Sequence, residues 1–521
     1  MKRPFSILLI FFCSIGYGQL IFQKPDSNLI ARSNSQVQVA SLLIDADIDF
    51  FEKALKQSIN SKEVYELEIK IQDAKLLNIY FDNFKLSKAS SLEVYNETGD
   101  LKVKVNSDNN REGELYAIPP IKGSSIKLIF KGNRSNSKIF IGEIGYFWKS
   151  FDDAYSSEPC EVDVNCSEGD EWKNQKNGVV RLLLKKNSSG VYCSGTILNN
   201  TSRDCRPYIL SAEHCVNDAT SGNLKQSFAY FNYENCNCGI DNAASGNFIL
   251  GMTKRASTKF NNSSDILLLE LDEEIPVEFN PYFNGWDISN IASPSGVSIH
   301  HPKGDVKKIS TYTSTLKTAD EFGLTEDAFW KVTWAETTNG HGVTESGSSG
   351  SPIFNHEKLV VGVLSYGDSY CIKPEDPDYY GKVSYSWNNQ PDSSKRLDVW
   401  LDPLQTFEES ITGSYFPCEN NNQVGSYFLC EDTSSYIYQD SIVIKLNPTS
   451  DGINVYIEQT ILNSVELFLV DVSGKIIFSR NEPSSNLTII EVPTNNIRNG
   501  LYFAVLHAGN KKQIFKVVVV N

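Results

Sequence analysis

The stretch Thr344-Glu345-Ser346-Gly347-Ser348-Ser349-Gly350-Ser351-Pro352 leads from small polar residues into Ile353-Phe354, where a buried strand is expected. Glycines on both sides of Ser349 allow a tight turn that leaves its hydroxyl exposed. In such a turn the amides of Gly347 and Ser349 can point at one spot and bind a developing oxyanion. On its own the stretch could equally be an ordinary Gly/Ser loop, so its interpretation depends on the rest of the chain.

Two other segments supply an imidazole and a carboxylate. His214 ends an apolar run that begins at Ile209, next to Cys215. Asp265 begins a second apolar run that ends at Leu271. The order along the chain is histidine, aspartate, serine, which is the order of the chymotrypsin arrangement.

Each of these three residue types has a chemical task in such an arrangement. Ser349 is a poor nucleophile until a base takes its proton, and the neutral imidazole of His214 can do so near pH 7. Asp265 would fix the tautomer of that imidazole and stabilise the imidazolium. Singly, each residue could have only a structural role. Together, in this order and these contexts, they indicate a catalytic triad.

Composition places the chain outside the cytoplasm and away from nucleic acid. Its 521 residues are enough for several domains, and the formal net charge of -16 argues against a nucleic-acid partner. Met1-Lys2-Arg3 and the apolar run from Ile7 to Phe12 indicate a signal peptide over 1–18, cleaved before Gln19. No later segment is long and apolar enough to predict a membrane helix. We expect a secreted or cell-surface protein exported through the periplasm.

The cysteines favour disulfides. Without Cys13, the eleven cysteines leave an even ten, as suits an oxidising compartment. Two short loops suggest pairs: Cys193 with Cys215, and Cys418 with Cys430. Metal binding is the alternative for Cys236-Asn237-Cys238, but no histidine or second close cysteine pair accompanies it. We therefore expect no metal site and no cofactor.

Strand-like segments predict an all-β chain. Residues 19–149 read as a β-sandwich-like domain, either a propeptide or an accessory binding domain. Many short strands over 150–417 predict two closed barrels, with His214 and Asp265 in the first and Ser349 in the second. Further expectations are a strand over 381–387 and a helix over 394–401. A polar linker spans 418–441, and a small β-sandwich spans 442–521.

The segment from Cys160 to about Leu404 resembles the bacterial lysyl endopeptidases, which are trypsin-fold serine proteases that cut after lysine. The resemblance lies in Cys160–Cys166, Cys193–Asn200, the His214-Cys215 strand, Asp265–Leu271, Gly285–Asp287, Ile299-His300-His301-Pro302, Gly342–Pro352, Tyr380–Val383 and Trp400–Pro403. It implies the disulfides Cys160–Cys371, Cys166–Cys238 and Cys193–Cys215. Cys205 and Cys236 have no counterparts in that pattern and are predicted to pair with each other.

The resemblance also implies a pocket for a basic side chain. It places Asp378 at the base of the primary specificity pocket, where a buried carboxylate favours an ammonium or guanidinium. Glu345 is a candidate second acid. The family has a histidine where Ser365 stands, so Ser365-Tyr366-Gly367 instead looks like the substrate-pairing strand of ordinary trypsin-like proteases. We expect cleavage after lysine, with arginine also accepted.

Maturation should differ from that of animal trypsins. Those pair a new N-terminus with an acid immediately before the nucleophile, and Ser348 at this position cannot supply the charge. We expect activation by release of the N-terminal domain, with self-cleavage after Lys149 as the hypothesis.

The last domain resembles the sorting domain read by the type IX secretion system of Bacteroidetes. The matching pieces are Leu446–Thr449, Val470–Lys475, Asn499–Phe503 and Lys516–Val519. A carbohydrate-binding module is the alternative, but the domain contains no tryptophan to stack on sugar.

The sequence therefore predicts a monomeric secreted serine endopeptidase, with protein or peptide substrates and the secretion machinery as partners. Two alternatives stay open. One is a surface adhesin on an inactive protease fold, which would be expected to lack a triad member or a glycine of the turn. The other is an active protease with a different pocket preference.

Overall fold

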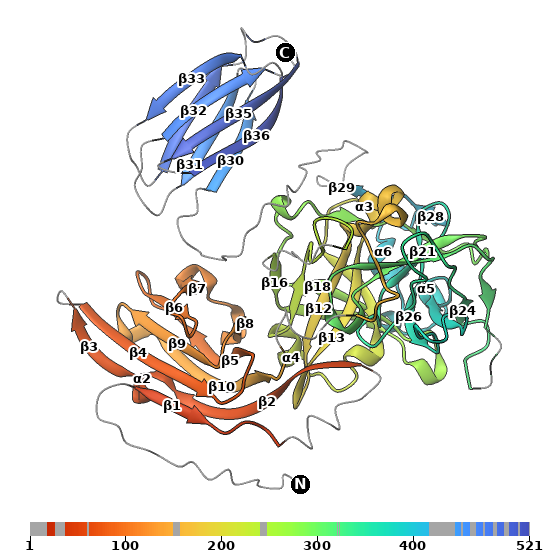
Figure 1. Cartoon of the computed structure of the whole chain (residues 1–521), viewed down its shortest axis with the longest axis horizontal. Coiled ribbons are helices and arrows are strands. Elements are labelled where there is room, and N and C mark those ends of the chain that lie inside the picture. The colour runs from red at the N-terminus through yellow and green to blue at the C-terminus, as the bar shows by residue number, and fades with distance from the viewer. Residues whose placement is uncertain are drawn as a thin grey trace. The chain divides into compact units, whose positions relative to one another are not determined.

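The computed structural model describes most of the chain's N-terminal and central parts and shorter pieces of its C-terminal part (Figure 1). The described residues are 18–26, 37–59, 62–149, 157–239, 247–319, 321, 323–415, 443–449, 452–458, 465–471, 475–482, 487–493, 497, 500–508 and 511–519. They fall into two compact units, and the N-terminal and central strands share the first. No helix among the described residues exceeds six residues, so the chain is all-β as predicted.

The N-terminal strands form two layers of sheet, as expected for a sandwich. One sheet has the order β1 (Gln19–Phe22), β4 (Lys62–Ile71), β9 (Ser125–Lys131), β6 (Ser91–Tyr95), β7 (Leu101–Asn106), with β3 (Leu55–Ile59) also on β4. The other contains β2 (Gln38–Asp49), β10 (Lys138–Phe147), β5 (Leu76–Lys85) and β8 (Tyr116–Lys122). Alternate residues of β4, such as Leu67 and Ile69, are fully buried, because successive side chains point to opposite faces.

The first central barrel closes through a bent strand. Its ring order is β12 (Val179–Lys185), β13 (Ser189–Leu198), β14 (Tyr208–Ala212), β18 (Ile266–Leu271), β17 (Met252–Ser257), β16 (Phe248–Leu250), β15 (Phe228–Tyr230). Only Gly251, with φ of 83°, separates β16 from β17. The strand can therefore turn there, pairing with β15 before the bend and with β18 after it.

The second barrel carries the Gly/Ser stretch. Its sheet order is β11 (Val162–Asp163), β22 (Lys308–Tyr312), β21 (Gly296–His300), β25 (Pro352–Phe354), β26 (Val360–Gly367), β27 (Asp378–Lys382), β24 (Phe329–Val332), β23 (Lys317–Thr318). The amide of Ala335, just beyond β24, donates to Thr311 of β22 at 2.8 Å and closes the ring. Leu210 and Ile266 of the first barrel share one buried cluster with Val297 and Val363 of the second.

One strand joins the N-terminal sheet to the first barrel. The start of β2 pairs antiparallel with β13, with Gln38 opposite Tyr192 and Leu42 opposite Ser189 (Figure 1). Ala40 of β2 is buried in the same cluster as Tyr192 and residues of β12 and β15. No local pattern indicates this pairing, because its partners are far apart along the chain.

Two expected elements differ from the structure. The strand predicted over 381–387 ends at Lys382, and Tyr385–Asn388 forms the short helix α5 instead. Trp387 of that helix packs on Trp286 with ring centroids 4.3 Å apart, so tertiary packing overrides the strand-like pattern. The helix predicted over 394–401 is two short turns, η9 (Ser393–Lys395) and α6 (Asp398–Leu401).

The second unit consists of two antiparallel sheets. One contains β30 (Val443–Thr449), β31 (Gly452–Glu458) and β34 (Leu487–Pro493). The other has the order β33 (Ile476–Glu482), β32 (Val465–Asp471), β35 (Gly500–Ala508), β36 (Lys511–Val519). The predicted hairpin at Val470–Lys475 joins β32 to β33, and the amide of Lys475 donates to the carboxylate of Asp471 at 3.0 Å.

Candidate active site

His214 and Asp265 meet at the edge of the first barrel. His214 lies in the turn η5 (Glu213–Cys215) directly after β14, and Asp265 lies directly before β18, which pairs with β14. Asp265 is fully buried and has φ of 56°, a left-handed conformation that aspartate tolerates better than most residues. This conformation turns its carboxylate back toward His214.

The Asp265 carboxylate accepts three hydrogen bonds. His214 Nδ1 lies 2.6 Å from Oδ2, and the backbone N–H of His214 donates to Oδ1 at 3.1 Å. The hydroxyl of Ser365, at the end of β26, donates to Oδ2 at 2.5 Å. Because the carboxylate only accepts, the neutral imidazole carries its proton on Nδ1 and its lone pair on Nε2. Nε2 is buried and makes no hydrogen bond to the described residues.

Ser349 is held beside this pair by its own backbone. Its carbonyl accepts the amide N–H of Ser194 in β13 at 2.8 Å and lies 3.9 Å from the sulfur of Cys215, the neighbour of His214. Gly350 has φ of 80°, and a Cβ there would lie 2.1 Å from the Ser211 hydroxyl. Only glycine therefore lets the turn approach the first barrel this closely.

The backbone N–H groups of Gly347 and Ser349 are available to a ligand. Within the described residues, neither the Gly347 N–H nor the Ser349 N–H donates a hydrogen bond. Gly347 has φ of 99°, and a Cβ there would lie 2.9 Å from the backbone nitrogens of Lys303 and Gly304. The turn is fixed around these amides, since the Ser348 N–H donates to the Glu345 carbonyl at 2.9 Å and the Gly350 N–H donates to the Leu364 carbonyl at 2.8 Å.

Asp378 lies under the same turn and is fully buried. Its carboxylate accepts from Trp334 Nε1 at 2.6 Å, from Thr344 Oγ1 at 2.8 Å, and from both the amide and the hydroxyl of Ser369. Burial raises its pKa, while these donors lower it. A Cβ at Gly367 would lie 2.2 Å from Asp378 Oδ1, so glycine keeps this approach open. Sequence reasoning did not identify Trp334, because its contact with Asp378 joins residues 44 positions apart.

The remaining predicted substrate-binding residues lie around the same turn. Tyr366 stacks on Tyr379 with ring centroids 4.4 Å apart. Glu345, the candidate second acid, uses both carboxylate oxygens elsewhere: Oε1 pairs with Lys303 Nζ at 2.7 Å, and Oε2 accepts the amide of Glu158 at 3.0 Å. Glu345 therefore connects the turn to the segment that contains Glu158. Its role in the specificity pocket stays a prediction.

Three disulfides follow the pattern that the resemblance implies: Cys160–Cys371, Cys166–Cys238 and Cys193–Cys215. Cys205 and Cys236 are both disulfide-bonded, and their pairing with each other stays a prediction. Cys418, Cys430 and the residues after Lys149 at the proposed cleavage site lie outside the described residues.

Comparisons with known proteins agree with these motifs. A family model described as the lysyl endopeptidase C-terminal domain matches residues 154–381. The central part of this chain resembles the lysyl endopeptidases. A lysyl endopeptidase of Pseudomonas aeruginosa is 28% identical over 295 residues, which are 52% of this chain and 61% of that protein. The chain thus spans less than two thirds of the length of this relative.

Solved structures of proteases are similar at low identity. Protease Anisep from Arthrobacter nicotinovorans is 15% identical with a TM-score of 0.30, covering 40% of this chain and 91% of that one. Kallikrein-related peptidase 10 is 16% identical with a TM-score of 0.29, covering 42% and 93%.

The C-terminal part matches a family model described as a secretion system C-terminal sorting domain, over residues 447–521. The protein is therefore exported. Among the described residues, none of the helices has the length and apolar character needed to cross a membrane.

Proposed function

We propose that this protein is a secreted serine endopeptidase that hydrolyses peptide bonds after lysine, and also after arginine. The observation that carries the proposal is the arrangement of His214, Asp265 and the Ser349 turn. The partly buried imidazole of His214 is bonded through Nδ1 to Asp265, and the neighbouring Cys215 has its sulfur 3.9 Å from the Ser349 carbonyl. Two amide groups of the same turn, those of Gly347 and Ser349, donate to none of the residues that the structure describes.

The proposed reaction uses each of these groups in turn. His214 Nε2 takes the proton of the Ser349 hydroxyl as its oxygen attacks the scissile carbonyl. The Gly347 and Ser349 amides stabilise the negative oxygen that forms. His214 then returns the proton to the leaving amine, and the acyl group stays on Ser349. A water molecule, deprotonated by His214, hydrolyses this ester and restores the hydroxyl. Asp265 stabilises the transient imidazolium throughout.

Asp378 is the proposed determinant of basic specificity. Removing a carboxylate from water is costly, and burial raises its pKa even with four donors around it. A substrate ammonium brought close to it offsets that cost, whereas an apolar or acidic side chain does not. The Thr344 and Ser369 hydroxyls, which both contact Asp378, can reorient to accept hydrogen bonds from the ammonium.

The C-terminal domain is proposed to be the part that the type IX secretion machinery reads. Deleting residues 442–521 should leave the protein inside the cell envelope of its native host, while the same deletion leaves the hydrolytic site intact. Normal secretion of the truncated chain would contradict this role.

Hydrolysis of matched peptide amides tests the function. The mature protein should cleave a peptidyl-lysine amide much faster than peptides with glutamate or alanine at the same position. Ser349→Ala should abolish the cleavage. Ser346→Ala is the matched control, because Ser346 is an exposed serine of the same turn and should leave the rate unchanged. No hydrolysis by the unchanged, folded protein would refute the proposal and favour a binding role. Undiminished cleavage by Ser349→Ala would refute Ser349 as the nucleophile.

A further inference from the structure

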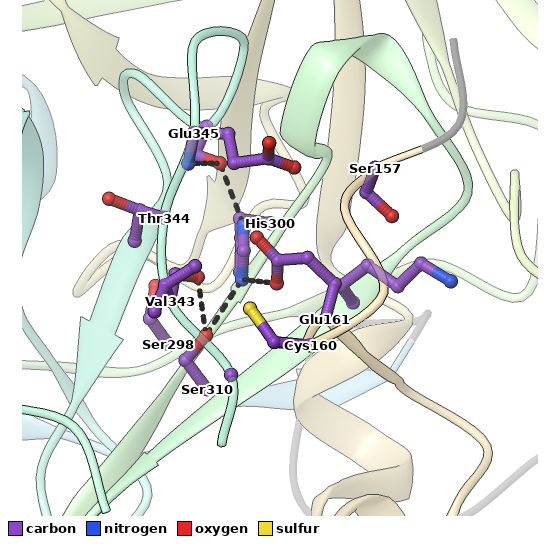
Figure 2. Close-up of polar contacts among 12 residues, drawn as sticks. Ser157, Cys160, Glu161, Ser298, His300, Ser310, Val343, Thr344 and Glu345 are labelled. Carbon is purple, nitrogen blue, oxygen red and sulfur yellow. Dashed lines mark hydrogen bonds and ion pairs between the residues drawn. The ribbon is translucent and has the colours of Figure 1, made fainter. Parts of the chain in front are cut away.

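A buried histidine outside the proposed triad touches the residue that precedes the nucleophile. His300 ends β21, is fully buried, and places Nδ1 2.7 Å from the Ser348 hydroxyl. On its other side, Nε2 lies 3.0 Å from the Ser310 hydroxyl of β22. Figure 2 shows this imidazole between the segment that carries Glu345 and the pair formed by Ser310 and Glu161. His300 lies in one of the motifs that resemble the lysyl endopeptidases, but its sequence context predicts no role for it.

The hydrogen bonds of the two serine hydroxyls determine which nitrogen of the His300 imidazole carries the proton. Ser310 donates its hydrogen to the carbonyl of Val343 at 2.7 Å, so its oxygen accepts from His300 Nε2. Nε2 therefore carries the proton, and Nδ1 is the acceptor. Ser348 donates to Nδ1, while its oxygen accepts the amide N–H of Glu345 at 3.2 Å. Every donor in this chain of hydrogen bonds then has an acceptor.

Burial keeps this imidazole neutral. Desolvation lowers the pKa of His300 to about 3, and the nearby charge of Lys308 lowers it too. Glu161 Oε2 lies 3.7 Å from Nε2, which would allow an ion pair if the imidazole were charged. However, burial and the charges of Glu345 and Asp378 raise the pKa of Glu161, although Lys308 lowers it. The imidazole is therefore best described as uncharged, because a second proton on it would leave the Ser348 hydroxyl hydrogen without its acceptor.

The hydrogen-bond chain fixes the turn at two points. It joins the carbonyl of Val343 and the amide of Glu345, at the start of the turn, to Ser348 immediately before the nucleophile. The anchor between them is the imidazole of His300, which the pairing of β21 with β22 holds in place. Ser348 carries no charge, so an ion pair with a new N-terminus cannot hold the turn at this residue. An uncharged link can.

We propose that His300 is a positioning residue, a neutral imidazole that holds Ser348 and thereby keeps the Gly347 and Ser349 amides aligned for the oxyanion. This inference rests on the proposed peptidase function. It also means that Ser348 can be held by an uncharged link, without a charged terminus.

Two substitutions of His300 separate the two halves of the link. In His300→Asn, the amide oxygen can occupy the position of Nδ1 and still accept from Ser348. In His300→Gln, the amide nitrogen can occupy the position of Nε2 and still donate to Ser310, but the acceptor for Ser348 is lost. Ser348→Ala removes the same contact from the other side. For each variant we would measure kcat and KM on the peptidyl-lysine amide and the thermal unfolding midpoint.

The expected effect is on kcat. Removing one oxyanion donor outright costs about 10²- to 10³-fold, and misaligning the donors should cost less, about 10- to 100-fold. His300→Gln and Ser348→Ala should show this loss with KM nearly unchanged, and the double variant should be no worse than either single. His300→Asn should keep most of the activity. If His300 had a purely structural role, the loss of kcat would instead parallel the loss of the unfolding midpoint. The Asn and Gln variants would then not differ in kcat beyond their difference in stability.

The outcomes separate this inference from the function on which it rests. If the unchanged protein does not hydrolyse the substrate, the proposed function fails. If it does, and Ser348→Ala and His300→Gln keep its kcat, only the role of His300 is overturned. Should His300→Gln fail to fold, Ser348→Ala decides the question by itself, because it removes only one hydroxyl.

Discussion

Replacing Asp265 with asparagine should lower kcat by about 10⁴-fold while leaving the fold intact. To keep accepting the His214 backbone N–H at 3.1 Å, the asparagine oxygen must stay at the Oδ1 position. Its NH₂ group then faces His214 Nδ1, where Oδ2 lay at 2.6 Å. The Ser365 hydroxyl, which donates to Oδ2, can rotate and accept from this NH₂ group. Two donors cannot face each other, so the imidazole proton moves to Nε2, and His214 can no longer take the Ser349 proton. The magnitude of about 10⁴-fold is the one known for the same tautomer change in a chymotrypsin-type triad.

Asparagine is the right substitution because Asp265 has φ of 56°. Asparagine also tolerates this left-handed conformation, whereas alanine would add about 1–2 kcal/mol of strain and confuse the result. The assay is kcat on the peptidyl-lysine amide, with the thermal unfolding midpoint as the control for folding. A folded Asp265→Asn protein that kept kcat within tenfold of the original would refute the assignment of His214 as the base.

Three further predictions concern specificity and stability. Asp378→Asn should lower kcat/KM for lysyl substrates by about 10²- to 10³-fold, in line with about 3–5 kcal/mol for breaking a buried ion pair, and undiminished cleavage would show that the pocket lies elsewhere. Replacing Cys193 and Cys215 together by alanine should lower the free energy of unfolding by about 3 kcal/mol for a loop of this length, measured by denaturant titration; an unchanged midpoint would contradict this. Glu234 is buried, which raises its pKa, but Lys307 and a second lysine lower it to about 2 overall. Its stabilising contribution is therefore present above about pH 4.5 and lost as the pH falls toward 2, so the stability difference between Glu234→Gln and the unchanged protein should shrink across that window. Burial lowers the pKa of Lys307, which reduces the net gain, and a difference that grew on acidification would contradict the assignment.

The proposed triad residues could be found from sequence because each has a local signature. His214 and Asp265 sit at the ends of apolar runs that became β14 and β18, and Ser349 sits in a turn whose glycines have positive φ. The Ser365 contact with Asp265 lies on a segment already singled out as the substrate strand. These features are short-range, and the chemistry restricts which residue types can serve.

The features that the sequence did not predict depend on contacts between distant parts of the chain. Nothing near His300 in sequence indicates that it would meet Ser348, which lies 48 residues away. The pairing of β2 with β13 joins residues that a sequence pattern cannot match, because many strands have similar alternation. The strand predicted at 381–387 failed for a related reason: Trp387 is drawn into a helix by its contact with Trp286.

Covalent labelling tests the central claim most directly. A fluorophosphonate reacts only with a serine hydroxyl whose proton is removed by a neighbouring base, next to donors that hold the phosphonate oxygen. We predict that mass spectrometry of the labelled mature protein will find the adduct on Ser349, and that His214→Ala will remove it. Absence of the adduct from the unchanged, folded protein, or its presence on a different serine, would contradict the account.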